Sequence, residues 1–575
     1  MNIRQLLDNR VSKALITAGA PDNSSAVIKQ SNRAEFGHYQ ANGVMGAAKQ
    51  LKMNPRELAA KVIEALDLND IAEKVEIAGP GFLNIHLKKA WLSQQLELAL
   101  NAEKLNIDQA NQPQTVVIDY SGPNLAKEMH VGHLRSTIIG DAVARTLDFI
   151  GHHVIRQNHV GNWGTQFGML LAHMNSLQAS DEELSMQLSD LEDFYRTAKK
   201  RFDNEEGFAE TARDYVVKLQ AGDADCLVLW QQFIDISLQH CDDIYSRLNV
   251  LLTRDDVMPE SAYNHDLANV IKDLNSAGLL TEDQGAQCVF LEEFRSKDDK
   301  ILPAIVQKSD GGYLYATTDL AALRYRHNEL KANRVLYFVD ARQSLHLNQV
   351  FAISKAANFV PQAMQLEHMA FGTMMGKDGK PFKTRDGGTV KLIDLLKEAE
   401  QRAFDLVSEK NPDLSEDERK AVAHTVGIGA VKYADLSKNR SSDYIFNWDT
   451  MLSFEGNTAP YLQYAYARIQ SIFRKAGEIN LDAKLHLDET AEKQLATKLL
   501  QLPEAIEIVV KDGTPNLLCN YLFELAGNFM SFYEACPILK ADDEIKNSRL
   551  KLAKLTAKTL ETGLGLLGIE TLDRM

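Results

Sequence analysis

The stretch that most constrains this chain is residues 116–168, where the sequence alternates between a strand, a helix and a second strand. Residues 116–118 form an apolar run that ends at the turn formers of residues 121–124, as a buried strand does. A helical pattern follows, Gly151 stands where it should stop, and a second strand is expected around residues 154–156. A strand–helix–strand unit of this length predicts parallel strands joined by a right-handed crossover. Ligands of such sheets bind at the carboxyl ends of the strands.

The residues expected at that edge are His130, Val131, Gly132 and His133. The two histidines lie three residues apart in the first helical turn, so both rings can face the same way. Helix N-termini attract anions, and imidazoles there can donate to a phosphate as negative charge develops on it. Gly132 lacks a Cβ and would let a flat base approach the backbone closely. Alone, the pattern fits two surface histidines at a helix cap equally well, but the strand before it and the apolar helix after it favour a nucleotide site.

Composition places the chain among ordinary globular proteins. Its 575 residues should split into about three or four domains, and 45% hydrophobic with 25% charged residues is a typical balance. No apolar run is long enough to span a bilayer, and the amphipathic N-terminal helix lacks the apolar core of a secretory signal. The five cysteines form no CxxC pair, so neither a zinc site nor a disulfide framework is indicated. We expect a cytoplasmic protein with no membrane partner.

The net charge of −16 argues against nucleic-acid binding. A protein built only to coat nucleic acid should be basic. An acidic chain that binds RNA has to concentrate its lysines and arginines on one face and to rely on shape for the rest. Only motifs can therefore support RNA binding here, and we expect no DNA partner.

The longer string SGPNLAKEMHVGHLRST, followed by NHVGNWGTQFG, resembles the arginyl-tRNA synthetases. HVGH after a strand is similar to the His-Ile-Gly-His signature of class I aminoacyl-tRNA synthetases, and the resemblance covers essentially the whole chain. It implies a multidomain protein whose α/β Rossmann-type catalytic domain carries a helical insertion, with an N-terminal α+β domain and a C-terminal α-helical bundle. The implied activity is ATP-dependent activation of L-arginine to arginyl-adenylate and transfer to the 3′-terminal ribose of tRNA(Arg). The expected cofactors are ATP and Mg²⁺, with no metal site made by the protein alone, and we expect a monomer.

The resemblance and the sequence pattern together divide the chain into six segments. They are an N-terminal domain that binds the tRNA corner or D-loop (1–108), the first half of the catalytic domain (115–178), a helical insertion and connective region (179–300), the second half with the phosphate-binding loop (301–390), a helical junction (391–455) and an anticodon-binding bundle (456–575).

Local patterns support the first and third of these segments. Helices are predicted at residues 3–18 and 56–66, followed by a hairpin around the Gly-Pro-Gly turn of residues 79–81. Residues 180–255 are charged and helical, as an insertion between the two halves of a class I sheet would be. On sequence alone, the first segment is better explained as a small α+β packing module, and the third fits a helical packing domain equally well.

Carboxylates in the second half of the sheet suit a cationic substrate. Fixed carboxylates bind a guanidinium as a bidentate fork, and Asp319 and Asp340 should lie near strand ends, where ligands bind. The resemblance makes Asp319 the expected guanidinium partner, with Tyr315 one helical turn before it. Without it, Asp319 would be assigned as a helix cap. The full set implied around the substrate arginine is Asp119, Ser121, Asn124, Tyr315, Asp319 and Gln343, of which Asp119 and Asn124 would serve the amino-group end or the neck of the pocket.

Residues 371–392 combine glycines with cationic side chains and predict a mobile loop suited to a triphosphate. Alone, the stretch also fits a basic surface turn. It corresponds to the class I Lys-Met-Ser-Lys-Ser loop, from which this chain departs. Matched on its lysines, the motif falls on residues 380–384 with Pro381 and Phe382 in place of Met and Ser; matched one residue later, Pro381 takes the place of the first lysine and Thr384 that of the second. Many arginyl enzymes with this departure carry a lysine just ahead of the histidine motif, where this chain has Lys127. The division of phosphate contacts stays open. The implied catalytic residues are Lys127, His130, His133 and Lys383, and the implied ATP contacts add Gly132, Lys380 and Arg385.

In the C-terminal segment, the sequence after Pro460 predicts a helix with an apolar face and a polar, aromatic face. An apolar stripe would leave Tyr461, Tyr464 and Arg468 on another face, where tyrosines beside arginine can stack on unpaired bases. Interhelical packing explains the same spacing. The resemblance implies that Tyr461, Tyr464 and Met575 hold the anticodon loop, and that Phe82 and Asn84 meet a D-loop base by stacking and hydrogen bonding.

Three other functions share some of these sequence features. A related nucleotidyltransferase could adenylate a different small molecule, which charging assays across the amino acids would reveal. A non-catalytic RNA-binding paralogue is disfavoured because both histidines and the nearby lysine are intact. A dehydrogenase is disfavoured because the first strand–helix turn lacks GxGxxG.

Overall fold

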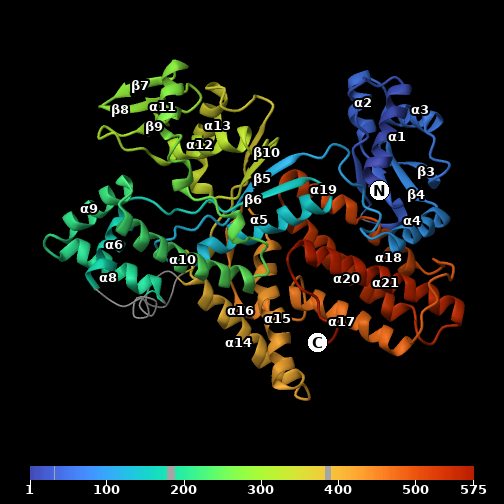
Figure 1. Cartoon of the computed structure of the whole chain (residues 1–575). Coiled ribbons are helices and arrows are strands. Elements are labelled where there is room, and N and C mark those ends of the chain that lie inside the picture. The colour runs from blue at the N-terminus through green and yellow to red at the C-terminus, as the bar shows by residue number, and fades with distance from the viewer. Residues whose placement is uncertain (32, 178–187, 189, 383–389) are drawn as a thin grey trace. The chain divides into compact units, whose positions relative to one another are not determined.

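The computed structural model describes the chain except residues 32, 178–187, 189 and 383–389 (Figure 1). The chain divides into two compact units. The smaller unit contains Met1–Ala110, Ser453–Gly565 and Glu570–Met575, and the larger contains Asn111–Leu452 and Leu566–Ile569. None of the described helices combines the length and the apolar character needed to cross a membrane.

The larger unit is organised around a parallel sheet with strand order β11-β10-β5-β6. Its first half confirms the predicted strand–helix–strand pattern, with β5 (Thr115–Asp119), α5 (Val131–Phe149) and β6 (His153–Gln157). The β5 residues 116–118 are fully buried, and α5 ends before Gly151, whose φ of 91° suits a glycine. This local order places the start of α5 beside the carboxyl ends of the strands.

The second half of the sheet follows a long excursion of the chain. It contains α12 (Tyr315–Asn328), β10 (Arg334–Tyr337), α13 (Ser344–Ala356) and β11 (Gln365–His368), so the strand and helix predicted there are present. β10 pairs with both β5 and β11, which brings residues far apart in sequence to one sheet (Figure 1). Apolar side chains of α12, β10 and α13 share one buried core.

The inserted region is helical, as predicted, but it also holds a small sheet. Its described helices are α6 (Thr165–Leu177), α8 (Leu191–Asn204), α9 (Phe208–Ala221), α10 (Ala224–Arg247) and α11 (Leu267–Ser276). β7 (Leu280–Asp283), β8 (Ala286–Val289) and β9 (Ala304–Gln307) form an antiparallel sheet that the sequence did not predict. Strands of four residues with little buried apolar surface leave only a weak alternating pattern, and the main signal is the tight turn at Gln284 and Gly285, both with positive φ.

Short elements complete the larger unit. β12 (Met374–Met375) pairs in parallel with β13 (Tyr444–Ile445). The helices of this part are α14 (Leu392–Lys410), α15 (Glu416–Leu436) and α16 (Trp448–Met451), with single 3₁₀ turns at Arg254–Asp256, Glu260–Tyr263 and Ala341–Gln343.

The smaller unit joins an α+β segment to a helical bundle. The first segment contains α1 (Ile3–Thr17), α2 (Gly43–Leu51), α3 (Pro55–Ala65) and α4 (Lys89–Asn101) around a sheet of β1 (Ile28–Gln30), β2 (Tyr39–Ala41), β4 (Phe82–Leu87) and β3 (Ala72–Ala78). The bundle contains α17 (Ala459–Ala476), α18 (Thr490–Leu499), α19 (Leu502–Asp512), α20 (Pro515–Ala535) and α21 (Asp543–Leu566). The predicted first and third helices and the β3–β4 hairpin are confirmed, whereas α2, α4, β1 and β2 were not predicted.

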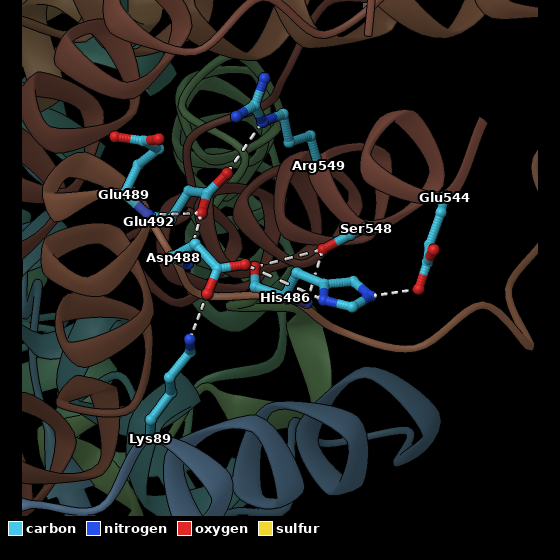
Figure 2. A network of polar contacts seen from close by, with 8 residues as sticks. All are labelled: Lys89, His486, Asp488, Glu489, Glu492, Glu544, Ser548 and Arg549. Atoms are coloured by element: carbon cyan, nitrogen blue, oxygen red, sulfur yellow. Dashed lines mark hydrogen bonds and ion pairs between the residues drawn. The ribbon is translucent and has the colours of Figure 1, made fainter. Parts of the chain in front are cut away.

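Polar contacts join the two parts of the smaller unit. The buried carboxylate of Glu504 accepts hydrogen bonds from Tyr39 Oη at 2.5 Å and from Gln30 Nε2 at 2.7 Å. Figure 2 shows a second network, in which Lys89 of α4 pairs with Asp488 just before α18. Burial raises the pKa of Glu504. The hydrogen bonds from Tyr39 and Gln30 provide partners for both of its carboxylate oxygens.

Candidate active site

One cavity of about 880 Å³ lies within the larger unit, at the carboxyl ends of its parallel strands. Residues from the turn after β5, the start of α5, the start of α12 and the end of β10 line it. The segments around Phe371 and Pro381, which flank β12, close another side. Of the predicted residues, the cavity brings together Asp119, Ser121, Asn124, His130, Gly132, His133, Tyr315, Asp319 and Gln343.

The two histidines hold each other in place at the start of α5. His130 is the N-cap, and its Nδ1 accepts a hydrogen bond from the backbone N–H of Gly132 at 3.0 Å. His133 Nδ1 accepts from the backbone N–H of His130 at 3.0 Å, and the ring centroids are 4.1 Å apart. Because each Nδ1 is an acceptor, each neutral ring carries its proton on Nε2. The helix start therefore presents two N–H donors from one capping box.

Burial keeps these rings neutral. It lowers the pKa of His133 to about 3 and also lowers the pKa of His130. A neutral imidazole can donate through Nε2–H without adding a full positive charge. The pair is therefore suited to hydrogen bonding with an anion over the whole physiological pH range.

Gly132 lines the cavity beside the ring of His130. A Cβ at this position would lie 2.7 Å from Cε1 of His130, so the glycine lets the capping histidine fold back over the helix start. The close approach of a flat base to this backbone stays a prediction.

The acidic end of the cavity is built on α12. Asp319 lies in the second turn of this helix, so the alternative that it caps a helix is wrong. It lines the cavity at the carboxyl ends of the strands, as predicted. Its Oδ2 is 2.6 Å from Nε2 of His346, and its Oδ1 is 3.9 Å from Nε2 of His159. The hydrogen bond to Asp319 raises the pKa of His346. Asp340 does follow β10, but its carboxylate is paired with Arg342 at 2.8 Å.

Glu260 is a second acid at this end that the sequence did not reveal. It lines the cavity, and burial together with the charge of Asp319 raises its pKa to about 7. Perturbed acids in a cavity are typical of functional sites. Glu260 is the first residue of a single 3₁₀ turn after Pro259, and it lies far along the sequence from the strands of the parallel sheet. No periodic pattern therefore marks it as a site residue.

The remaining predicted arginine contacts lie around the cavity in different settings. Asp119 ends β5, and its Oδ2 accepts a hydrogen bond from Nη2 of Arg326 at 2.6 Å. Ser121 is buried with a φ of 71°, and its Oγ lies 2.7 Å from the hydroxyl of Tyr245. Tyr315 lies at the start of α12 and is 68% exposed where it lines the cavity. Asn124 and Gln343 are exposed on the rim.

The predicted phosphate cations are less clearly placed. Nζ of Lys127 lies 4.3 Å from the ring centroid of Tyr195, and Lys127 is not among the residues that line the cavity. Lys380 is exposed in a turn, where its own backbone carbonyl accepts a hydrogen bond from the N–H of Gly376 at 2.7 Å. Lys383 and Arg385 lie outside the described residues.

The predicted tRNA contacts lie in the smaller unit. Phe82 is half-buried, but Asn84 is only 2% exposed and its Oδ1 accepts from Gln40 Nε2. Tyr464 is 39% exposed, and the guanidinium of Arg468 lies over its ring and over that of Tyr533. Tyr461 contacts Phe523, and Met575 is half-buried.

Comparisons with known proteins cover the whole chain. Residues 95–448 match the family tRNA synthetases class I (R), catalytic domain; residues 462–575 match the DALR anticodon binding domain; and residues 1–87 match the arginyl tRNA synthetase N terminal domain. Relatives named arginine–tRNA ligase from Hahella chejuensis and a Marinomonas species are 64% and 61% identical, with all of both chains covered.

Solved structures agree. The Plasmodium falciparum arginyl-tRNA synthetase superposes with a TM-score of 0.86 at 31% identity, covering 100% of this chain and 99% of that one. The Thermus thermophilus arginyl-tRNA synthetase, at 24% identity, shares the fold with a TM-score of 0.83 and full coverage of both chains. The predicted fold class and the resemblance are thus confirmed, and the chain belongs to the arginyl-tRNA synthetase family of class I aminoacyl-tRNA synthetases.

Proposed function

We propose that the cavity activates L-arginine with ATP and passes it to the 3′-terminal ribose of tRNA(Arg). One observation carries this proposal: the same cavity holds two neutral imidazole donors at a helix N-terminus and two acids, Asp319 and Glu260, that suit a guanidinium. Anions bind at helix N-termini and guanidinium groups bind carboxylates. A cation and a polyanion can therefore meet in one enclosed space.

The arrangement suits an in-line attack of the arginine carboxylate on the α-phosphate. His130 and His133 would donate their Nε2–H groups to phosphate oxygens, where the bonds strengthen as charge develops. No side-chain nucleophile is needed, because positioning and electrostatic stabilisation carry such a step. Lys127, Lys380, Lys383 and Arg385 are proposed as further phosphate contacts, and for Lys127 this requires leaving the ring of Tyr195.

Mg²⁺ would be bound mainly by the phosphates, since this ion is usually held by substrate oxygens, water and one or two carboxylates. Within the described part of the chain, no three His, Cys, Asp or Glu side chains are grouped to hold an ion. When bound, it would neutralise phosphate charge.

The contacts with tRNA are proposals of the same kind. Tyr461, Tyr464 and Met575 would meet the anticodon loop, supported by the exposed stack of Tyr464 on Arg468. Phe82 and Asn84 would meet a D-loop base, and for Asn84 the hydrogen bond with Gln40 would first have to open. The division into six segments, a monomeric state and a cytoplasmic location remain predictions.

Arginine-dependent aminoacylation of total tRNA tests the proposal directly. We expect the wild-type chain to charge arginine and no other amino acid, and His133→Ala and Asp319→Ala to lose most of that activity. ATP–pyrophosphate exchange with arginine should also require tRNA. Charging of another amino acid would point to a different substrate, and rapid exchange without tRNA would contradict the proposed order of events.

A further inference from the structure

A buried arginine lies directly behind the cavity. Arg326 of α12 has no exposed surface and is not among the residues that line the cavity. Its Nη2 donates to Asp119 at 2.6 Å, its Nε donates to Gln157 at 2.6 Å, and its guanidinium carbon lies 4.9 Å from the ring centroid of Tyr337. Tyr337, Asp119 and Gln157 are register partners at the ends of β10, β5 and β6. The guanidinium of Arg326 therefore contacts the last residue of each of three neighbouring strands.

The same side chain also places the acidic end of the cavity. Arg326 follows Asp319 by seven residues, two turns of α12, so both lie on one face of the helix. The hydrogen bonds of Arg326 attach α12 to the ends of β5 and β6. Asp319, on the same face of α12, lines the cavity together with Asp119.

Charge is distributed unequally over the acids that line the cavity. Asp119 is paired with Arg326, and Asp340 is paired with Arg342. Asp319 and Glu260 have no lysine or arginine partner among the described residues, and the contacts of Asp319 are histidines. Asp119 is therefore neutral as a pair with Arg326, whereas Asp319 and Glu260 carry net negative charge at a pH above the pKa values of Glu260 and His346.

L-Arginine has the matching distribution. Its guanidinium end carries one positive charge, and its α-carbon end is a zwitterion with no net charge. On the proposed function, with Asp119 meeting the amino-group end of the substrate, we infer that Arg326 is a positioning residue for substrate recognition. By neutralising Asp119 it makes this part of the cavity select the zwitterionic α-carbon of arginine over a bare amine. It acts through Asp119 and does not touch the substrate.

The inference is tested with agmatine, which is arginine without its carboxylate and is positively charged at both ends. The measurement is the ratio of agmatine Kd to arginine Kd, by isothermal titration calorimetry of the full chain at pH 8. Arg326→Gln leaves Asp119 negatively charged, which favours the bare amine, so we expect this ratio to fall by about tenfold or more. In Asp119→Asn/Arg326→Gln the end is neutral again, and the ratio should return toward the wild-type value.

Arg334→Gln is the matched control. Arg334 is a buried arginine at the other end of β10, paired with Glu367 at 2.6 Å, and it does not line the cavity. Its loss removes a similar buried ion pair from the same sheet, yet the ratio should stay within about twofold of wild type. An unchanged ratio in Arg326→Gln, or an equal fall in Arg334→Gln, overturns the inference.

Two further outcomes are decisive. If circular dichroism shows that Arg326→Gln does not fold, Asp119→Asn alone takes its place. This variant leaves the positive charge of Arg326 unpaired, so the ratio of agmatine Kd to arginine Kd should rise. An unchanged or lower ratio overturns the inference. Failure of the wild-type chain to bind arginine would instead refute the proposed function. Binding of arginine with a ratio that no variant alters would refute the inference alone.

Discussion

The two ends of the cavity are built on different principles. The nucleotide end is made from a capping box, in which His130 and His133 are held by backbone N–H groups within a single helical turn. The arginine end is made from side chains of three separate elements, Glu260, Asp319 and His346, which hold and perturb one another. Burial lowers the pKa values of both histidines at the first end, to about 3 for His133. At the second end burial raises the pKa of Glu260 to about 7, and the hydrogen bond to Asp319 raises that of His346. We therefore expect substitutions at the first end to affect the rate and those at the second to affect arginine affinity and its pH dependence.

The largest effect is expected from His133→Ala. The substitution removes an Nε2–H donor and also the acceptor that holds His130 N–H. Loss of one donor to developing charge costs about 10²–10³ in kcat, and the KM for arginine should change little because the acids are untouched. Steady-state aminoacylation measures both constants. A change in the KM for arginine larger than the change in kcat would break the division between the two ends.

Asp319→Asn should produce the next largest effect, in the opposite constant. The amide keeps the shape but removes the charge that a guanidinium binds, so the KM for arginine should rise by about 10- to 100-fold. The KM for ATP should stay near its wild-type value. His133→Ala is the reciprocal control, and equal effects of Asp319→Asn on both KM values would show that the two ends are coupled.

The pH dependence separates the ends further. Below pH 7, Glu260 binds a proton and loses its attraction for a guanidinium, because its pKa is raised to about 7. The pKa of His346 is also raised, so this side chain gains a positive charge beside Asp319 as the pH falls. That charge also weakens the attraction of Asp319 for a guanidinium. The KM for arginine should therefore rise as the pH falls from 8 to 6, by up to about tenfold per pH unit for one titrating group.

The constant kcat is the internal control for this experiment. His133 remains neutral across the range because its pKa is about 3. Glu260→Gln should remove most of the slope in KM while leaving kcat at saturating arginine nearly unchanged. A slope that survives this substitution in full would assign the titration to another group.

The smallest effect is expected from Gly132→Ala. A Cβ would lie 2.7 Å from the ring of His130 and would force this ring to shift without removing any hydrogen-bonding group. We expect a fall in kcat of about tenfold, smaller than that of His133→Ala, since about 1.4 kcal/mol of lost stabilisation corresponds to tenfold. Single-turnover kinetics would detect it, and a loss as large as that of His133→Ala would show that the ring position matters as much as the donor.

Local sequence patterns determined those elements of this protein that depend on residues close together in the sequence. The buried run of β5, the stop at Gly151 and the histidine pair at the start of α5 all depend on neighbours within a few residues. Helix periodicity, caps and strand alternation act at that range. For this reason the strand–helix–strand unit, the helix α1 and the β3–β4 hairpin were predictable.

Tertiary structure alone decided which side chains meet. The contact of Arg326 with Asp119 spans 207 residues, and that of His346 with Asp319 joins two helices. Neither Glu260 at the acidic end nor the burial of Asn84 against Gln40 leaves a local signal. Such contacts arise from sheet register and helix packing, which bring distant residues together only when the whole unit folds. The sequence by itself therefore determined the turn for which we propose nucleotide binding, and the tertiary structure decided the charge distribution of the cavity that this turn lines.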